Sequence, residues 1–281
     1  MEFLKTTETT EKELAALMVG YEIDMTLERK KVEKGETILS LQNVRLLPQA
    51  EKTVDLEIRA GEILGIAGVE GNGQQQLEEM IMGLEKVKCG KIFFKQEEIT
   101  GMSVKERCKR GIGYIPSDRY KRAILPGFSL KDNYLLGNQY KDSYARKGML
   151  NQEYIEKKTK ELMEKFDVRA VNGDQLIGAL SGGNQQKLVL SREVDKDPDL
   201  ILACQPVRGL DIGAIKFIHN VLLELRNQGK AVLLISAELS DLFQLSDRIG
   251  VLYKGEMMSL QETEKYTTES ISLLMAGKKG V

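Results

Sequence analysis

The stretch Leu180-Ser181-Gly182-Gly183-Asn184-Gln185-Gln186-Lys187 places a serine and two glycines at a predicted helix start. Serine is a good helix N-cap, and glycine lets the backbone approach a ligand closely. The first N–H groups of a helix have no partner within the helix, so such a start favours binding of an anion such as phosphate. A bare Ser-Gly-Gly is by itself more typical of an ordinary turn, so the neighbouring sequence has to decide.

The sequence downstream of this stretch changes the interpretation. After a predicted helix at 185–194, the apolar run Leu200-Ile201-Leu202-Ala203-Cys204 has the length and flanks of a buried strand. It leads into the turn Gln205-Pro206-Val207-Arg208-Gly209-Leu210-Asp211. This order of motifs resembles the ATP-binding cassette (ABC) ATPases, which carry Leu-Ser-Gly-Gly-Gln and then a strand ending in Asp-Glu-Pro. The resemblance spans most of the chain.

Composition excludes several other classes of function. The chain has 281 residues, 42% of them hydrophobic, which suffices for a buried core. Its 41 basic and 42 acidic residues give a net charge of −1, which offers no general attraction for nucleic acid or anionic lipid. Cys89, Cys108 and Cys204 are odd in number and form no Cys-x-x-Cys pair, so neither a disulfide framework nor a metal site is predicted. A reducing cytosol fits this cysteine usage best.

No segment has the character of a membrane span or a secretory signal. The longest strongly apolar runs, such as 231–237, are far shorter than the roughly 20 residues that a spanning helix needs. The start of the chain, Met1-Glu2-Phe3-Leu4, lacks the basic start and apolar centre of a secretory signal. Any role at a membrane is therefore expected to pass through a partner.

The chain divides into three predicted parts. Residues 1–36 combine a short helix at 11–19 with a charged connector, which is typical of a linker. The resemblance to tandem importer ATPases implies that this part is the tail of a missing first cassette, and that Met1 need not be the biological start. Residues 37–260 form the nucleotide-binding domain, and residues 261–281 form a C-terminal extension.

Within the domain, strands and helices alternate. Alternating apolar residues at 37–60 predict antiparallel strands, and residues 121–180 are mainly helical in pattern. The other predicted elements are strands at 63–67, 91–94, 231–236 and 249–253, with helices at 74–84 and 215–227. This order predicts an α/β fold with a mostly parallel core sheet covered on both faces. The resemblance implies the P-loop NTPase type of this fold, with an antiparallel β subdomain and a helical subdomain at about 121–180.

The loop after the strand at 63–67 has the glycine spacing of a phosphate loop. It reads Gly68-Val69-Glu70-Gly71-Asn72-Gly73-Gln74-Gln75, so glutamines replace the lysine and hydroxyl of Gly-x-x-x-x-Gly-Lys-Ser/Thr. A Rossmann loop is the rival, but Gln76 stands where its third glycine belongs. Backbone N–H groups at 71–74 are expected to hold phosphate weakly. A lysine lost at roughly 4 Å from a phosphate forfeits about 4 kcal/mol of attraction, so reduced affinity for ATP is predicted.

Further positions depart from the pattern that the resemblance implies. Cys204 and Gln205 align with the aspartate that helps place magnesium and the glutamate that polarises the attacking water. Glutamine cannot accept a proton from water, and a positioned general base contributes about 10²- to 10⁴-fold. Ala237 aligns with the switch histidine and Ser117 with the Gln-loop residue, while the single histidine, His219, is expected to have a surface or packing role. We therefore assign no catalytic residue and no metal ligand.

The signature stretch is intact although these positions are eroded. In the family, each ATP lies between the P-loop, Asp-Glu and histidine of one cassette and the signature helix of the other. Our hypothesis is that the chain donates its signature to a partner's site, which holds most of the ATP and Mg²⁺, while its own site is deficient in hydrolysis. The candidate nucleotide-binding residues are Gly68, Gly71, Asn72, Gly73, Gln74 and Gln75 in the loop, Ser181, Gly182, Gly183, Asn184 and Gln185 in the signature, and Asp211 in the following turn.

Three more stretches are similar to the second cassette of ribose, galactose and nucleoside importer ATPases. They are 116–122, 128–133 and 205–214, and the glutamine at 205 resembles the nucleoside branch. The resemblance implies an intact cassette and membrane permease subunits as partners, a solute-binding protein as an indirect partner, and a peripheral position on the cytoplasmic face of the cell membrane. It implies no nucleic-acid partner, and the sequence does not name the solute.

Two alternatives stay open at this point. An ABC ATPase of DNA repair or chromosome structure usually needs a basic surface or a long coiled coil, and this chain has neither. An inactive, truncated remnant that folds without a partner is the other. Neighbouring reading frames for an intact cassette, permeases and a binding protein would favour transport.

Overall fold

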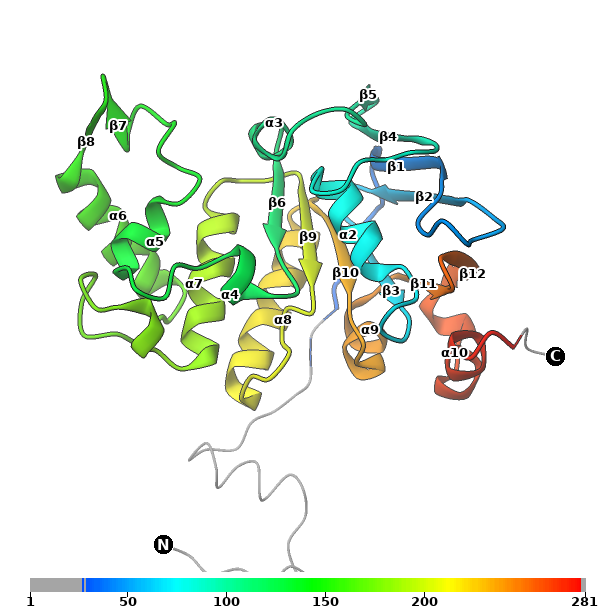
Figure 1. The fold of residues 1–281 in the computed structure, drawn as a ribbon. Coiled ribbons are helices and arrows are strands. Elements are labelled where there is room, and N and C mark those ends of the chain that lie inside the picture. Colours follow the sequence, from blue (N-terminus) through cyan, green and yellow to red (C-terminus); the bar gives the residue numbers. More distant parts are fainter. Residues whose placement is uncertain (1–26, 28, 279–281) are drawn as a thin grey trace, which may run out of the picture.

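A six-stranded sheet forms the centre of the protein (Figure 1). The computed structural model describes residues 27 and 29–278, so the helix predicted at 11–19 lies outside the described residues. The strands follow the order β12-β11-β3-β10-β9-β6. Their bounds are β3 (Ile63–Ala67), β6 (Ile112–Ile115), β9 (Leu200–Cys204), β10 (Ala231–Ile235), β11 (Arg248–Tyr253) and β12 (Glu256–Glu262).

Pairing in this sheet is parallel from β6 to β11, and only β12 pairs antiparallel, with β11. The side chains of β9 show why these strands read as continuous apolar runs. Leu200, Leu202 and Cys204 pack into one hydrophobic cluster, while Ile201 and Ala203 pack into a second cluster on the opposite face. Both faces are covered, which confirms the predicted α/β fold with a mostly parallel sheet.

One face of the core sheet is covered by helix α2 (Gln74–Met82) and an antiparallel sheet. This second sheet has the order β2-β1-β4-β5. Its strands are β1 (Thr37–Val44), β2 (Val54–Arg59), β4 (Lys91–Phe94) and β5 (Glu97–Glu98), and helix α3 (Val104–Lys109) follows them. In β2 the residues Val54, Leu56 and Ile58 are buried and alternate with exposed polar residues, as the sequence pattern predicts.

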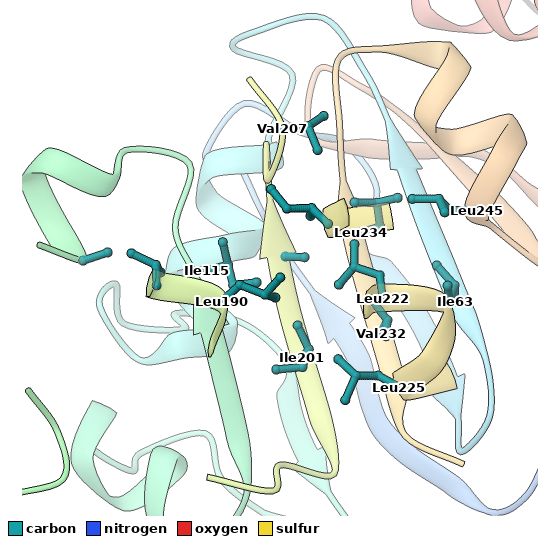
Figure 2. Packing of buried hydrophobic residues seen from close by; sticks show 14 of the residues in the cluster. Ile63, Ile115, Leu190, Ile201, Val207, Leu222, Leu225, Val232, Leu234 and Leu245 are labelled. Carbon is teal, nitrogen blue, oxygen red and sulfur yellow. The ribbon is translucent and has the colours of Figure 1, made fainter. Parts of the chain in front are cut away.

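Helices α7 (Gly182–Val194), α8 (Ile212–Asn227) and α9 (Leu239–Leu245) contribute to the cluster on the other face. Figure 2 shows Leu222 and Leu225 of α8 beside Ile201 and Val232 of the sheet. Helices α2 and α7 therefore lie on opposite faces of the core sheet, and Figure 1 shows them on the two sides of β6 and β9.

The segment 121–180 is mainly helical, as expected, but it also contains a small hairpin. Its helices are α4 (Arg119–Arg122), α5 (Leu130–Leu135), α6 (Gln152–Lys165) and a 3₁₀ turn, η1 (Ile177–Ala179). Strands β7 (Ala145–Arg146) and β8 (Met149–Leu150) pair antiparallel. The turn between them consists of Lys147 and Gly148, which both have positive φ. Lys-Gly lacks the Asn-Gly signal of such turns, and two-residue strands carry no periodicity, so the sequence did not indicate this hairpin.

The C-terminal segment is part of the domain. The predicted boundary at residue 260 falls inside β12, and η2 (Thr263–Lys265) and α10 (Thr268–Met275) follow it. Ile271 of α10 is fully buried in the cluster on the α7 side of the sheet. The sequence pattern did not predict β12. Its residues are half-buried without alternation, so they carry no period-two apolar pattern. Among the described residues, no helix is long and apolar enough to span a membrane.

Candidate functional site

The glycine-rich loop connects β3 to α2, as predicted. Gly73 is the N-cap of α2 with a φ of 107°, and a Cβ atom built on it would lie 3.2 Å from the Cα of Gly255. Asn72 ties the loop to the same β11–β12 turn, because its Oδ1 accepts a hydrogen bond from the N–H of Lys254 at 2.9 Å. Its own N–H donates to the carbonyl of Val69 at 3.1 Å. Asn72 is therefore committed to the fold of the loop, which leaves fewer free donors for phosphate than the sequence suggested.

The two glutamines that follow Gly73 hydrogen-bond within the protein. The Nε2 of Gln74 donates to the carbonyl of Val69 at 3.1 Å, so its carboxamide folds back over the loop. A Cβ atom on Gly68 would overlap this nitrogen. The Oε1 of Gln74 is buried and has no hydrogen-bond partner among the described residues. Gln75 donates to Glu79 Oε1 at 2.8 Å. Neither side chain presents a cation or a hydroxyl.

Ser181 begins the signature helix as predicted. Its hydroxyl accepts a hydrogen bond from the N–H of Asn184 at 3.4 Å and another from the Asn184 Nδ2 at 3.1 Å. Ser181 is exposed, and Asn184 Oδ1 accepts from the N–H of Arg169 at 2.8 Å. The helix start thus presents an exposed hydroxyl, and the first N–H groups of a helix lack partners in a preceding turn, which suits an anion.

Gln185 lies beneath the helix start rather than on its exposed edge. It is 1% exposed, and its Nε2 donates to the carbonyls of Ile177 and Leu180 at 3.3 and 3.1 Å. The Oε1 accepts from the Nε of Arg119 at 3.3 Å. These contacts hold the Gln185 carboxamide against the turn before α7. The sequence suggested that Gln185 contacts a ligand, but its side chain points away from the exposed edge.

Arg119 is a residue of this region that sequence analysis missed. A Cβ atom on Gly182 would lie 2.9 Å from the Nη2 of Arg119, so the guanidinium rests against the signature glycine. The sequence signal was present, since 118–122 carries charged and aromatic residues. The contact places a positive charge beside the helix start.

Asp211 also lies against the signature helix. Its Oδ1 accepts from the N–H of Ala214 at 2.9 Å and so caps α8. A Cβ atom on Gly183 would lie 2.9 Å from the Asp211 Oδ2, so only glycine fits here without a shift. The fold therefore brings Asp211 next to Gly183.

The residues aligned with the family's catalytic acids and histidine meet at the ends of β9 and β10. Cys204 is fully buried, and Gln205 Oε1 accepts from the N–H of Ala237 at 3.2 Å. A carboxamide and a backbone N–H group therefore connect these two strand ends. Among the described residues, no cluster of three or more His, Cys, Asp or Glu is arranged to hold a metal.

His219 lies inside α8. It is 1% exposed, and its Nε2 lies 3.3 Å from the Asp241 Oδ1. Neither ring nitrogen has a hydrogen bond of good geometry among the described residues. His219 therefore packs in the interior, which fits the packing role expected for it.

A second residue that sequence analysis missed is Glu78 of α2. It is 2% exposed, and its Oε1 accepts hydrogen bonds from the Tyr114 hydroxyl and from the N–H of Ser117. Burial and the neighbouring Glu78 carboxylate hold the pKa of the Cys204 thiol well above its ordinary value. Glu78 contacts Tyr114 and Ser117 on either side of Ile115, which pairs with Ala203, so a carboxylate from α2 lies near the end of β9. No sequence motif marks it.

Comparisons with known proteins agree with this fold. The family model described as "ABC transporter" matches residues 52–208. The chain is 40% identical over 274 residues to the guanosine import ATP-binding protein NupO of Bacillus subtilis, covering 96% of this chain and 54% of NupO. It is 37% identical over 272 residues to the nucleoside import ATP-binding protein NupA of Lactococcus lactis subsp. cremoris, covering 95% of this chain and 54% of NupA. The chain thus spans about half the length of these curated relatives.

Solved structures show the same fold. MJ1267, described as an ATP-binding cassette of an ABC transporter, matches with a TM-score of 0.71 and 21% identity, over 86% of this chain and 98% of that one. The cassette MJ0796, described as dimeric in a post-hydrolysis state with ADP and Pi, matches with a TM-score of 0.68 and 23% identity, over 80% of this chain and 99% of that one. The chain belongs to the ABC transporter family, and its fold is that of an ATP-binding cassette.

Proposed function

We propose that the chain is an ATP-binding subunit, or part of one, of an ABC importer for nucleosides or related sugars. The proposal is supported by relatives named for guanosine, nucleoside and ribose import. Such a subunit would act from the cytoplasmic face of the cell membrane, with permease subunits and, indirectly, a solute-binding protein. These relatives do not favour the alternative of an ATPase of DNA repair or chromosome structure.

Within this importer we assign the chain to the degenerate second cassette. One observation carries this assignment: the signature side of the fold keeps its phosphate-binding chemistry while the phosphate-loop side has lost it. Ser181 is exposed and caps the helix that it begins. Gln74, by contrast, folds back onto the carbonyl of Val69 and brings no charge. Bound ATP would supply a transferable terminal phosphoryl group and Mg²⁺ would neutralise its charge, but the loop residues of this chain do not fit the pair well.

The position of the two helices supports a role in a dimer. Helices α2 and α7 cover opposite faces of the core sheet, so the signature of this chain does not close over its own phosphate loop. A second cassette facing Ser181, Gly182 and Gly183 would present its own phosphate loop to them. In that complex, Ser181 and the first amides of α7 would hold the terminal phosphate of the partner's ATP, where one well-placed donor contributes about 10²- to 10³-fold.

The test mixes the purified chain with a catalytically complete partner cassette and measures ATP turnover. The wild-type chain should raise turnover, and Ser181→Arg should abolish the gain because it fills the signature with a bulky cation. Ser103→Arg is the matched control, since Ser103 also caps a helix, α3, but belongs to neither motif. An equal gain with Ser181→Arg would refute signature donation. If the wild-type chain alone turns over more ATP than Ser181→Arg alone, the proposal that its own site is deficient in hydrolysis is refuted.

A further inference from the structure

The buried carboxylate of Glu78 binds a segment that begins where strand β6 ends. Its Oε1 accepts from the N–H of Ser117 at 3.2 Å and from the hydroxyl of Tyr114, the third residue of β6. Burial, together with the Glu78 charge and hydrogen bond, raises the pKa of Tyr114, so its hydroxyl remains a donor at neutral pH. A single oxygen thus joins α2 to both sides of the turn at Pro116.

Glu79, the next residue on α2, holds the other end of the segment. Its Oε1 pairs with the Nη2 of Arg122 in α4, and the Nη1 of Arg122 donates to the Tyr114 hydroxyl oxygen at 3.4 Å. Burial acts to raise the pKa of Glu79, but hydrogen bonds from Gln75 and Arg122 and the Arg122 charge outweigh it, so this pKa lies below its ordinary value. Helix α2 therefore forms hydrogen bonds with Tyr114, Ser117 and Arg122 through two adjacent carboxylates.

The segment also reaches the signature helix. Arg119 lies between Ser117 and Arg122, and its Nε donates to Gln185 while its guanidinium rests against Gly182. A continuous set of contacts therefore leads from α2, which begins at the phosphate loop, through 117–122 to the start of α7.

We propose that Glu78 is a positioning residue that replaces the strand-end carboxylate missing at Cys204 and anchors residues 117–122 to α2 without nucleotide. The position of this segment, and through Arg119 that of the signature start, is then set by protein contacts alone. Glu78 and a carboxylate at 204 would be two like charges in one buried space, which is unfavourable. The proposal depends on the contacts of Glu78 and holds whether or not the chain donates its signature.

Hydrogen–deuterium exchange of the full chain, followed by mass spectrometry, tests the anchor. In the wild type, amides at 117–122 should exchange at the same rate with and without saturating MgATP. Glu78→Leu should speed their exchange on the order of tenfold, because the acceptor for Ser117 is lost. Glu78→Gln should stay near the wild type, since its Oε1 can still accept both bonds. Gln76→Leu, on the same helix, is the control.

Tyr114→Phe covers the case in which Glu78→Leu does not fold. It removes one hydroxyl, keeps the ring, and should speed exchange at 117–122 by a smaller factor than Glu78→Leu. The proposal is overturned if MgATP slows exchange at 117–122 in the wild type, or if the segment exchanges equally in the wild type, Tyr114→Phe and whichever Glu78 variants fold.

Substitutions at Glu78 and Cys204 give an independent test of the proposal. Cys204→Asp alone should lower the midpoint of thermal unfolding, because it adds a buried carboxylate beside Glu78. Combining it with Glu78→Leu should recover part of that loss, which makes the double mutant more stable than the sum of the single changes predicts. Additive effects of the two substitutions would show that the carboxylates do not share one position. That result would overturn the proposal that Glu78 replaces a carboxylate at 204.

Discussion

Replacing Asp247 by asparagine should destabilise the domain, and the structure sets the size of the effect. Asp247 accepts hydrogen bonds from the Nε and Nη2 of Arg226 at 2.9 and 2.6 Å and from the N–H of Ile63 at 2.9 Å. The Nη2 of Arg29 lies 2.8 Å from it. The side chains of Asp247 and Arg226 are 9% and 7% exposed. This carboxylate therefore joins the start of β11 to β3, to α8 and to the segment before β1.

The magnitude follows from the charge that remains. Asparagine keeps the shape and one acceptor oxygen, but it leaves the guanidinium of Arg226 buried without a counter-charge. Breaking such a buried pair costs about 3–5 kcal/mol, and the retained acceptor places Asp247→Asn near the lower end, at about 3 kcal/mol. For a domain of this size that corresponds to a fall of roughly 6–12 °C in the unfolding temperature.

The effect should also depend on pH. Burial acts to raise the pKa of Asp247, but hydrogen bonds from Arg226 and Ile63 and the charges of Arg226 and Arg29 outweigh it, so the pKa lies below the ordinary value of 3.8. Because the folded pKa is depressed, the stabilisation is fully present above the unfolded pKa of about 3.9 and is lost as the pH falls through the folded pKa. The wild type and Asp247→Asn should therefore converge in stability only below about pH 4.

Urea unfolding at neutral pH and at a series of lower pH values measures this difference. Asp197→Asn is the matched control, because Asp197 pairs with Lys230 while its own side chain is 86% exposed. Exposed pairs contribute about 0–1 kcal/mol, so the control should change little. Equal losses for the two variants, or a loss in Asp247→Asn that does not shrink in acid, would contradict the reasoning.

Two further substitutions test the phosphate loop and its helix. Gln74→Lys should tighten binding of ATP by about tenfold or more, because it restores part of the roughly 4 kcal/mol of lost charge attraction; titration with a fluorescent nucleotide measures this, and unchanged affinity would show that the missing lysine is not the limiting defect. Arg107→Met should cost about 3 kcal/mol or more in urea unfolding, since Arg107 is 1% exposed and donates to four backbone carbonyls, two of them in the last turn of α2. A loss below about 1 kcal/mol would contradict that role.

Several elements were readable from the sequence because their signals are local. The strand at Leu200–Cys204 has the predicted bounds, since a run buried on both faces is apolar at every position. Ser181 begins α7 because an N-cap needs only its own hydroxyl and an N–H three residues on. The hairpin Ala145–Leu150 and strand β12 lack such signals, because their pairing depends on neighbours brought by the rest of the chain.

The sequence by itself determined the α/β class, the glycine spacing of the loop after β3 and the absence of lysine and hydroxyl after Gly73, because residue type and spacing decide these properties. Only the tertiary structure decided that Gln74 folds back onto Val69, that Gln185 is buried and that Glu78 reaches the end of β9. These three outcomes depend on side chains that meet carbonyls, hydroxyls and charges from other elements. No periodicity or motif records which distant groups a side chain will reach once the sheet and helices have packed.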